Sequence, residues 1–349
     1  MLQPAFISSN MSDRHESTSN NIAPNNFPLL PITSPQTIEQ CRNLPLKSSD
    51  IFICSYPKSG TTWTQHILLS LLRAEEGKDI PEYDHVSDYA PFYEIDPHWE
   101  SDDADSPRIL QSICDKHSML GRRVFNTHLR WDMLPCNAEA SADNAGMEAE
   151  SCGAKFIYLV RSPLDVCVSF YHHLSSQVEG RYEKGFDNFF SDWLAGRIAF
   201  GSWIDHIQSF AAAAPFVNSF QKNENVFNDT RKVLLIYYED LISDLSTQVD
   251  RIIEFLGLRV PESVRTELLP TFSFKHMKNE KNLSKFQPKS VTWIGDYKFL
   301  RNGVVGDYSS LISREQEEAF IASFSQNEDF INCINHTFGP VGSSKLNLC

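Results

Sequence analysis

Residues 56–63, with the sequence Tyr-Pro-Lys-Ser-Gly-Thr-Thr-Trp, constrain the fold of this chain more than any other segment. They follow an apolar run at 51–54 and precede a helical pattern that begins at Thr61. A helix that starts after a strand and a short loop presents free N–H groups and its positive dipole end, where a phosphate can bind. Gly60 lets the backbone approach an anion, and Lys58 adds a positive charge. The segment is not a Walker A loop, because its lysine precedes its only glycine, and its small residues also suit an ordinary strand-to-helix turn.

Strand and helix patterns alternate along the rest of the chain. Short apolar runs predict strands at 51–54, 123–127, 156–160 and 233–237. Apolar residues at helical spacing predict helices at 61–73 (closed by Gly77), at 165–174, within 186–215, and before Gly257. A last helix opens with the capping box of Ser313 and Gln316 and is expected to bury Phe320, Ile321 and Phe324. This alternation predicts an α/β fold with a central parallel sheet flanked by helices.

The composition along the chain predicts one domain with less regular ends. Residues 1–40 are predicted to be a disordered tail, because this region is rich in Ser, Asn and Pro without periodicity. We expect the domain at 41–340, with an exposed insertion at 136–153 and a C-terminal tail at 341–349. Residues 79–108 combine acidic, aromatic and proline residues, which fits either a functional loop or a disordered insert.

The bulk composition excludes some classes of function. The chain has 349 residues and a formal charge of −14, which argues against a nucleic-acid partner. An anion-binding cleft must therefore be basic locally, and Lys58, Arg161 and Arg301 are the candidates. The absence of a long apolar run argues against a membrane span. The eight cysteines form no C-x-x-C pair, so we expect reduced thiols, a cytoplasmic protein and no bound metal.

The segment Pro-Lys-Ser-Gly-Thr-Thr-Trp at 57–63 resembles the phosphosulfate-binding loop of the cytosolic sulfotransferases. That family moves a sulfuryl group from 3′-phosphoadenosine-5′-phosphosulfate (PAPS) to a hydroxyl or amine and releases adenosine 3′,5′-bisphosphate. The resemblance extends from about residue 46 to about residue 324 and implies one domain with a P-loop-nucleotide-kinase-like sulfotransferase fold. The donor contacts it implies in this loop are Lys58, Ser59, Gly60, Thr61, Thr62 and Trp63.

His128 is the candidate catalytic base. It follows a predicted strand, and open parallel sheets bind ligands at the carboxyl ends of their strands. A histidine pKa near neutrality suits proton abstraction from a hydroxyl, although a single histidine is more often structural. The resemblance favours catalysis, because Thr-His-Leu followed by Leu134-Pro135 matches the family's catalytic-histidine segment. Many members have a lysine where this chain has Asn126, and Lys58 would neutralise the leaving oxygen.

Two further segments resemble the family's 3′-phosphate site. Arg161 and Ser169 match the first, and the resemblance implies that Ser169 also holds the lysine side chain away from the sulfate until an acceptor binds. Asp165 between them is interpreted as a helix N-terminal charge only. Residues 301–308 match the family's C-terminal signature, in which Arg301, Asn302 and Gly303 would contact the nucleotide; Asn302 replaces a lysine and Tyr308 a tryptophan.

The remaining contacts concern adenine and the acceptor. The resemblance assigns the nucleotide to Trp63, Tyr238, Ser273, Phe274 and Met277, although Trp63 and Phe274 also suit a plain hydrophobic core. It assigns the acceptor to Phe92, Ile95, His128, Tyr171 and His173. Such a pocket favours a flat or polycyclic apolar molecule with one hydroxyl, such as a phenol, sterol or alcohol.

Two questions stay open at the level of sequence. The family's dimerisation stretch is not recognisable after Tyr308, so we expect a monomer or a weak homodimer. A metal-dependent small-molecule kinase and a catalytically inactive nucleotide-binding module are the rival functions. The first predicts Mg²⁺-dependent ATP binding, and the second predicts loss of Lys58 or His128, both of which are present.

Overall fold

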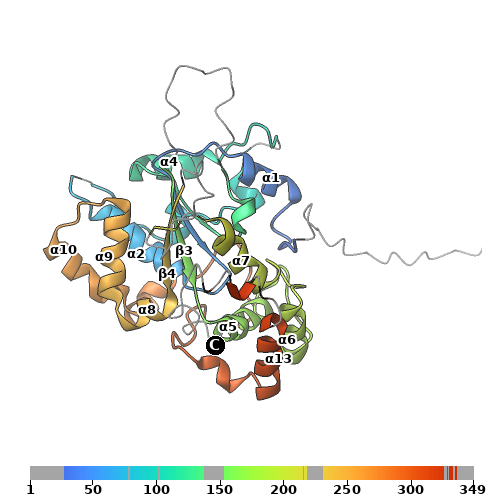
Figure 1. Cartoon of the computed structure of the whole chain (residues 1–349). Coiled ribbons are helices and arrows are strands. Elements are labelled where there is room, and N and C mark those ends of the chain that lie inside the picture. The colour runs from blue at the N-terminus through green and yellow to red at the C-terminus, as the bar shows by residue number, and fades with distance from the viewer. Residues whose placement is uncertain are drawn as a thin grey trace, which may run out of the picture.

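The described residues of the computed structural model are 27–77, 79–100, 103–136, 153–214, 216–217, 231–325, 328, 330–332 and 335 (Figure 1). They contain one sheet of four parallel strands in the order β2-β1-β3-β4. These are β1 (Ile51–Ser55), β2 (Val124–Thr127), β3 (Lys155–Val160) and β4 (Lys232–Tyr237). All residues of β1 and β2 are buried, as expected for parallel strands covered on both faces. The predicted α/β fold with a parallel sheet is confirmed.

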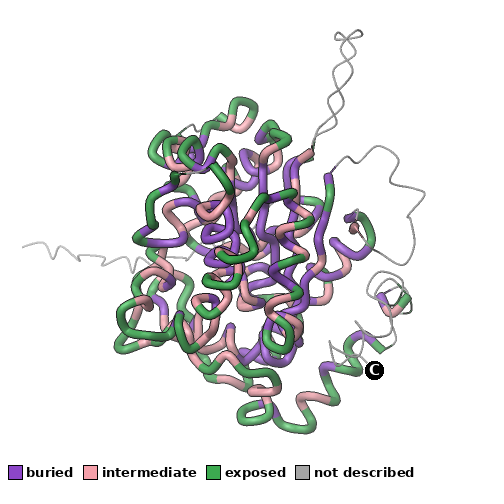
Figure 2. The backbone as a smooth tube through the Cα atoms, turned by 90° about the vertical axis from the view of Figure 1, so that its left-hand side faces the viewer, coloured by how far each residue is buried: buried purple, intermediate pink, exposed green. Residues whose placement is uncertain are grey.

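Alternate strand residues face opposite layers of helices. Ile51 and Ile53 join a hydrophobic cluster with α2 (Thr61–Arg73) and α9 (Leu245–Leu256). Phe52 joins the other cluster, with α1 (Pro35–Asn43), α5 (Pro163–Ser175), α6 (Phe186–Leu194) and α7 (Trp203–Ala213). Figure 2 shows the buried residues concentrated in the interior of the molecule. The sheet therefore separates two hydrophobic clusters and contributes side chains to both.

Further helices and turns complete the described fold. The helices are α3 (Val86–Tyr89), α4 (Gln111–Leu120), α8 (Tyr238–Ser243), α10 (Glu262–Leu268), α11 (Phe274–Met277), α12 (Glu280–Leu283) and α13 (Arg314–Ser325). The 3₁₀ turns are η1 (Asp96–His98), η2 (Trp131–Met133), η4 (Leu269–Phe272) and η5 (Asp307–Ser310). Within the described ranges, no helix is both long enough and apolar enough to cross a membrane.

The strand order places a crevice at the carboxyl ends of β1 and β3. From β1 the chain continues to β2 on one side, and from β3 it continues to β4 on the other. Ligands of open α/β sheets bind where the strand order reverses in this way. Lys58 follows β1 and Arg161 follows β3, so the topology brings both residues to this crevice.

Several details predicted for the helices are confirmed, but the end of α2 and the burial of Ile321 are not. The bounds of α2 are those predicted, Gly257 ends α9 with a φ of 66°, and Ser313 and Gln316 exchange the two hydrogen bonds of a capping box. Gly77 does not close α2, because Ala74 already caps it with its N–H bonded to the Ser70 carbonyl. Ile321 is exposed, since it lies one residue past Phe320 and so leaves the buried face of α13.

The predicted disordered tail over residues 1–40 is too long. Phe27 and Leu30 are buried in the core, and α1 begins at Pro35 with Ser34 as its N-cap. The acidic segment 79–108 is also built into the fold, since α3 and η1 lie within it and Phe92 forms a bridge to Asn126 beside β2. Residues 1–26, 137–152 and 341–349, on which the other tail and insertion predictions fall, lie outside the described residues.

Candidate active site

A large cavity opens at the carboxyl ends of the strands. Its empty space, including the opening to solvent, is about 1470 Å³. Residues after β1, β2 and β3 line it, together with α5 and the loop at 301–304.

The loop after β1 leads into the bare N-terminus of α2. Gly60 is the N-cap with a φ of 106° and supplies no side-chain cap, so the first N–H groups of α2 face the cavity without a capping partner. A Cβ at position 60 would lie 3.0 Å from the Tyr238 ring, which is a second reason for glycine. The Thr61 hydroxyl is fixed by a 2.7 Å hydrogen bond with Ser55 Oγ. This geometry forms an anion-binding end of the cavity.

Lys58 reaches from this loop toward α5. Its Nζ lies 3.3 Å from His173 Nδ1 and 4.1 Å from the centroid of the Phe299 ring. Burial, followed by the nearby charges of Arg161 and Arg301, lowers the pKa of Lys58 to about 7. Burial also holds the pKa of His173 well below its usual value, so a neutral imidazole accepts the hydrogen bond from the ammonium.

His128 lies at the end of β2 with its ring orientation fixed. Its Nδ1 is 2.8 Å from the Ser55 carbonyl oxygen, so this nitrogen carries the proton and Nε2 keeps the lone pair. The Phe92 and Phe200 rings flank the imidazole with centroids 5.3 Å away. Burial lowers the pKa of His128 to about 4. The imidazole is therefore neutral near pH 7 and can accept a proton.

A buried carboxyl group supports the His128 backbone. Glu94 Oε1 accepts the His128 N–H at 2.6 Å, and burial raises the pKa of Glu94 to about 8. Glu94 follows Phe92 in the segment that pairs with β2, where Asn126 donates to the Ala90 carbonyl at 2.7 Å. These two bonds hold the wall that carries Phe92 against the strand that carries His128.

Arg161 joins the ends of β1 and β3. Its Nη1 donates to the Lys58 carbonyl at 3.0 Å, and its guanidinium lies 4.3 Å from the centroid of the Tyr238 ring. Arg161 is itself buried, and its Nε has no hydrogen-bond partner. A buried donor without a partner at the edge of a cavity marks a place for an anionic ligand.

Asp165 anchors the C-terminal loop to α5. Its carboxylate accepts the N–H groups of Gly306 at 2.8 Å and Tyr308 at 3.0 Å. The interpretation of Asp165 as a helix N-terminal charge only is therefore wrong. Contacts between a side chain and backbone groups 141 and 143 residues away leave no local sequence pattern.

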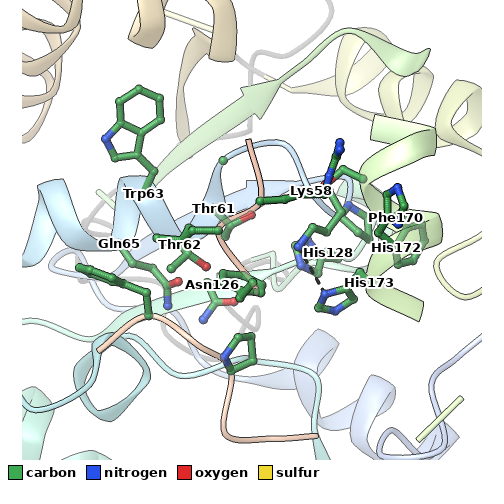
Figure 3. Close-up of a pocket in the computed structure, with 18 of the residues that line it drawn as sticks. Lys58, Thr61, Thr62, Trp63, Gln65, Asn126, His128, Phe170, His172 and His173 are labelled. Atoms are coloured by element: carbon green, nitrogen blue, oxygen red, sulfur yellow. Dashed lines mark hydrogen bonds between the residues drawn. The ribbon is translucent and has the colours of Figure 1, made fainter. Parts of the chain in front are cut away.

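Aromatic rings line another part of the cavity. Trp63 donates through Nε1 to the Phe272 carbonyl at 2.7 Å and meets the Tyr238 ring edge to face at 5.7 Å. Gly303 has a φ of 68°, and a Cβ there would lie 2.5 Å from the Phe274 ring. Phe274 thus packs directly on the backbone of the C-terminal loop. In Figure 3, Trp63 stands apart from the cluster of Lys58, His128 and His173.

A family model described as the sulfotransferase domain matches residues 48–329. The chain belongs to the sulfotransferase family. The enzymes of this family take a sulfuryl group from PAPS and pass it to a small acceptor, and this chain is such an enzyme. The resemblance drawn from the loop at 57–63 is confirmed.

Named relatives match over most of their length. Sulfotransferase 1C2 of Rattus norvegicus is 26% identical over 317 residues, covering 89% of this chain and 89% of the relative. The amine sulfotransferase of Oryctolagus cuniculus is 27% identical, with 83% and 84% covered. The luciferin sulfotransferase of Photinus pyralis is 29% identical, with 79% and 71% covered.

Two solved structures share the fold. Mouse sulfotransferase SULT7A1, complexed with PAP, superposes with a TM-score of 0.60 at 23% identity and covers 89% of this chain and 97% of its own. Retinol dehydratase, complexed with retinol and PAP, gives a TM-score of 0.60 at 21% identity, with 90% and 89% covered.

Most of the residues predicted for donor and acceptor of this sulfotransferase line the one cavity. They are Lys58, Gly60, Thr61, Thr62, Trp63, Phe92, His128, Arg161, Ser169, His173, Tyr238, Phe274, Met277, Arg301, Asn302 and Gly303. Ser59 and Ser273 lie just outside it: Ser59 is buried beneath the loop with an unpartnered hydroxyl, and Ser273 caps α11. The Lys58 ammonium bonds to His173 rather than to Ser169, which the resemblance had implied.

Two predicted acceptor residues do not reach the sulfotransferase cavity. Ile95 is buried in the core where η1 begins, while Phe92 faces the cavity. Tyr171 packs against Phe186 and Phe189, with centroids 5.2 and 5.4 Å away. Tyr171 lies two residues past Ser169 and so on the opposite side of α5. His172 and His173, three and four residues past Ser169, return to the face that lines the cavity.

Other residues of the sulfotransferase cavity were not predicted from the sequence. His172, Phe200 and Phe299 line it, and the wall also includes Leu30 from the segment before α1. Phe200 has a φ of 68°, which is rare for a bulky residue and is held by its N–H bond to the Pro28 carbonyl. The unusual φ has no sequence signature, since the residue is not glycine. Among the described residues, no group of three or more side chains is arranged to hold a metal ion.

Gly303→Ala should weaken nucleotide binding by roughly tenfold or more. The added Cβ would overlap the Phe274 ring, and a φ of 68° disfavours alanine by about 1 kcal/mol. Titration calorimetry with adenosine 3′,5′-bisphosphate measures the loss. Gly306→Ala is the matched control, because its φ is 80° but no atom lies within 4 Å of the added Cβ. Equal losses in both variants would contradict the proposed role of the Phe274 contact.

Proposed function

We propose that His128 and Lys58 catalyse sulfuryl transfer from PAPS to a hydroxyl or amine on an apolar acceptor. The observation that carries this proposal is that both side chains line one cavity (Figure 3). The same cavity is lined by the cations Arg161 and Arg301, here called the cationic end, and by the rings of Phe92, Phe170 and Phe200, here called the aromatic end. Arg161 bonds to the Lys58 carbonyl, and the Lys58 ammonium lies over the Phe299 ring. Catalysis of this kind depends on positioning and charge stabilisation.

The cationic end binds the donor nucleotide. The bare N-terminus of α2 and Lys58 hold the phosphosulfate, with Thr61 and Thr62 at the start of that helix and Ser59 in the loop before it. The 3′-phosphate binds Arg161, Ser169, Arg301 and the Gly303 backbone, with Asn302 beside them. The adenine lies among Trp63, Tyr238, Phe274 and Met277, with Ser273 fixing the start of α11. The unpartnered Nε of Arg161, which lines the cavity, supports this assignment.

The reaction follows from the two central side chains. Nε2 of His128 takes the proton of the acceptor hydroxyl as its oxygen forms a bond to sulfur. The bond from sulfur to the bridging oxygen breaks, and the electron pair stays on the phosphate oxygen beside Lys58. The ammonium stabilises the charge that develops there. Adenosine 3′,5′-bisphosphate and the sulfated acceptor are the products.

The aromatic end selects the acceptor. Phe92, Phe170 and Phe200 line it with Leu30 and Tyr297, so a flat or polycyclic apolar body fits beside His128. The amine and luciferin sulfotransferases among the relatives show by their names that acceptors differ within the family. A screen of phenols, sterols, alcohols and amines would identify the acceptor of this chain. Transfer to none of them would argue against the proposed acceptor class.

We also propose a single sulfotransferase domain, present in the cytoplasm as a monomer or weak homodimer. The described segments from Phe27 to α13 pack around one sheet, which supports one domain. Cys41, Cys54 and Cys167 are buried free thiols, which fits a reducing compartment. Cell fractionation and light scattering on the purified enzyme test compartment and oligomeric state. A membrane-bound fraction or a tight dimer would contradict this assignment.

His128→Ala should lower transfer by roughly 10²–10⁴-fold without loss of nucleotide binding. The imidazole acts on the acceptor proton, while the phosphates bind elsewhere in the cavity. Transfer is followed with labelled PAPS, and binding is followed with adenosine 3′,5′-bisphosphate. The control is His276→Ala, which removes an exposed histidine that lies on α11 between Phe274 and Met277 and does not line the cavity, and it should keep full activity. Transfer that survives in the His128 variant would contradict the assignment of the base.

Binding of adenosine 3′,5′-bisphosphate at pH 8 should take up about one proton. Lys58 is largely neutral at this pH because its pKa in the empty site is about 7, and an adjacent phosphate raises that pKa. The phosphates themselves are already dianionic at pH 8, since their second pKa is about 6. Calorimetry in buffers of different ionisation enthalpy measures the uptake, and Lys58→Met should abolish it. A binding enthalpy independent of buffer would overturn the prediction.

His173→Phe should raise cleavage of PAPS by water, in the absence of acceptor, by roughly tenfold. The variant keeps an aromatic ring but removes the nitrogen that holds the Lys58 ammonium, a bond to a charged group that is worth about 1.5 kcal/mol. Lys58 is then free to turn toward the leaving oxygen. Ser169→Ala serves as the comparison and should instead weaken nucleotide binding. An unchanged rate of acceptor-independent cleavage would show that His173 does not restrain Lys58.

A further inference from the structure

One carboxylate lies inside the cationic end of the cavity. Asp307 starts η5 and lines the cavity together with Arg301 and Asn302. Its Oδ2 is paired with Arg301 Nη2, and its Oδ1 accepts a hydrogen bond from Asn302 Nδ2 at 2.9 Å. The Asp307 side chain is 16% exposed and that of Arg301 is 29% exposed, so water screens this ion pair only in part.

The surroundings of Asp307 are those proposed for the donor's 3′-phosphate. Burial alone would raise its pKa, but hydrogen bonds from Asn302 and Arg301 and the charges of Arg301 and Arg161 hold the pKa of Asp307 below its usual value. Burial lowers the pKa of His172 on α5; the charge of Arg301 lowers it in the same direction, and the charge of Asp307 opposes the shift. The carboxylate is therefore ionised at neutral pH and sits among the groups expected to bind a phosphate.

We propose that Asp307 is an internal counter-ion that competes with the 3′-phosphate of donor and product for Arg301. The same guanidinium edge cannot serve the carboxylate and a phosphate at once, and two anions in contact repel each other. The inference rests on the proposed assignment of the 3′-phosphate to Arg301. In the empty enzyme Asp307 holds Arg301 in place, and on binding the nucleotide must displace it.

A purely structural role for Asp307 is a weaker explanation of the contact. The loop that carries it is already fixed by Asp165, which accepts the N–H groups of residues on both sides of Asp307. Lys278 further ties the Arg301 carbonyl to α11 through a short hydrogen bond. The charge of Asp307 therefore acts mainly on Arg301 and on whatever anion approaches it. Competition of this kind limits the affinity for adenosine 3′,5′-bisphosphate and so favours release of the product.

The test compares two nucleotides in three proteins. Asp307→Asn keeps the shape of the side chain and its bond with Asn302 but removes the negative charge. Asp296→Asn removes one charge from an exposed residue of the same region and serves as the control. Titration calorimetry measures binding of adenosine 3′,5′-bisphosphate and of adenosine 5′-monophosphate, which lacks the 3′-phosphate.

We expect Asp307→Asn to bind adenosine 3′,5′-bisphosphate roughly three- to tenfold more tightly, with the affinity for adenosine 5′-monophosphate unchanged. The Asp296 variant should match the unmodified enzyme for both nucleotides. Weaker or unchanged binding of the bisphosphate in the Asp307 variant overturns the proposal, and so does an equal gain for both nucleotides. Failure of the unmodified enzyme to bind the bisphosphate would instead overturn the proposed nucleotide site itself.

Discussion

Holding Lys58 beside two guanidinium groups and away from bulk water is electrostatically unfavourable, and much of the site is organised around that fact. The Lys58 ammonium lies 4.1 Å from the centroid of the Phe299 ring and 3.3 Å from Nδ1 of the neutral His173 imidazole. Asp307 forms an ion pair with Arg301. These contacts stabilise the cations of the empty cleft only in part, as the lowered pKa of Lys58 indicates. An incoming anion removes the remaining repulsion. Part of the binding energy for a doubly phosphorylated nucleotide is thus stored in the free enzyme as repulsion among cations.

The sheet makes this concentration of charge possible in a protein of net charge −14. Parallel strands end at one edge, so residues that are far apart in sequence meet there without long loops. Lys58 and Arg161 are joined by a 3.0 Å hydrogen bond across the ends of two neighbouring strands. Positive φ angles at Lys58 and Gly60 fold the loop between β1 and α2. The Lys58 side chain and the N-terminus of α2 therefore face the same cavity. The local fold therefore sets the electrostatics.

The sequence predicted the strands and helices around the cavity better than the contacts between them. Strand β1, helix α2 and the end of α9 followed from apolar periodicity, a glycine C-cap and a phosphate-loop resemblance, all of which are local signals. The links between elements had no local signal: Asp165 bonds to Gly306 and Tyr308, and His173 bonds to Lys58. Tyr171 was misplaced because family resemblance assigns a segment to the pocket without fixing the rotation of its helix. The segment before α1 was mistaken for part of the tail because its Ser/Pro-rich composition hides the contacts of Phe27 and Leu30.

The departures from the family pattern become intelligible once their contacts are seen. Asn126, in place of a lysine, donates to the Ala90 carbonyl and so turns a charged position into a bond that holds the Phe92 wall. Asn302, again in place of a lysine, donates to Asp307 instead of adding a charge beside it. Tyr308, in place of a tryptophan, reaches Glu317 on α13 with its hydroxyl at 3.3 Å and ties the loop to the last helix. Each change replaces a cation or an apolar ring of the family pattern with a hydrogen bond within the protein. The lysine and arginine residues that line the cavity are Lys58, Arg161 and Arg301, so the few groups that oppose or restrain these three residues have a correspondingly large influence on its electrostatics.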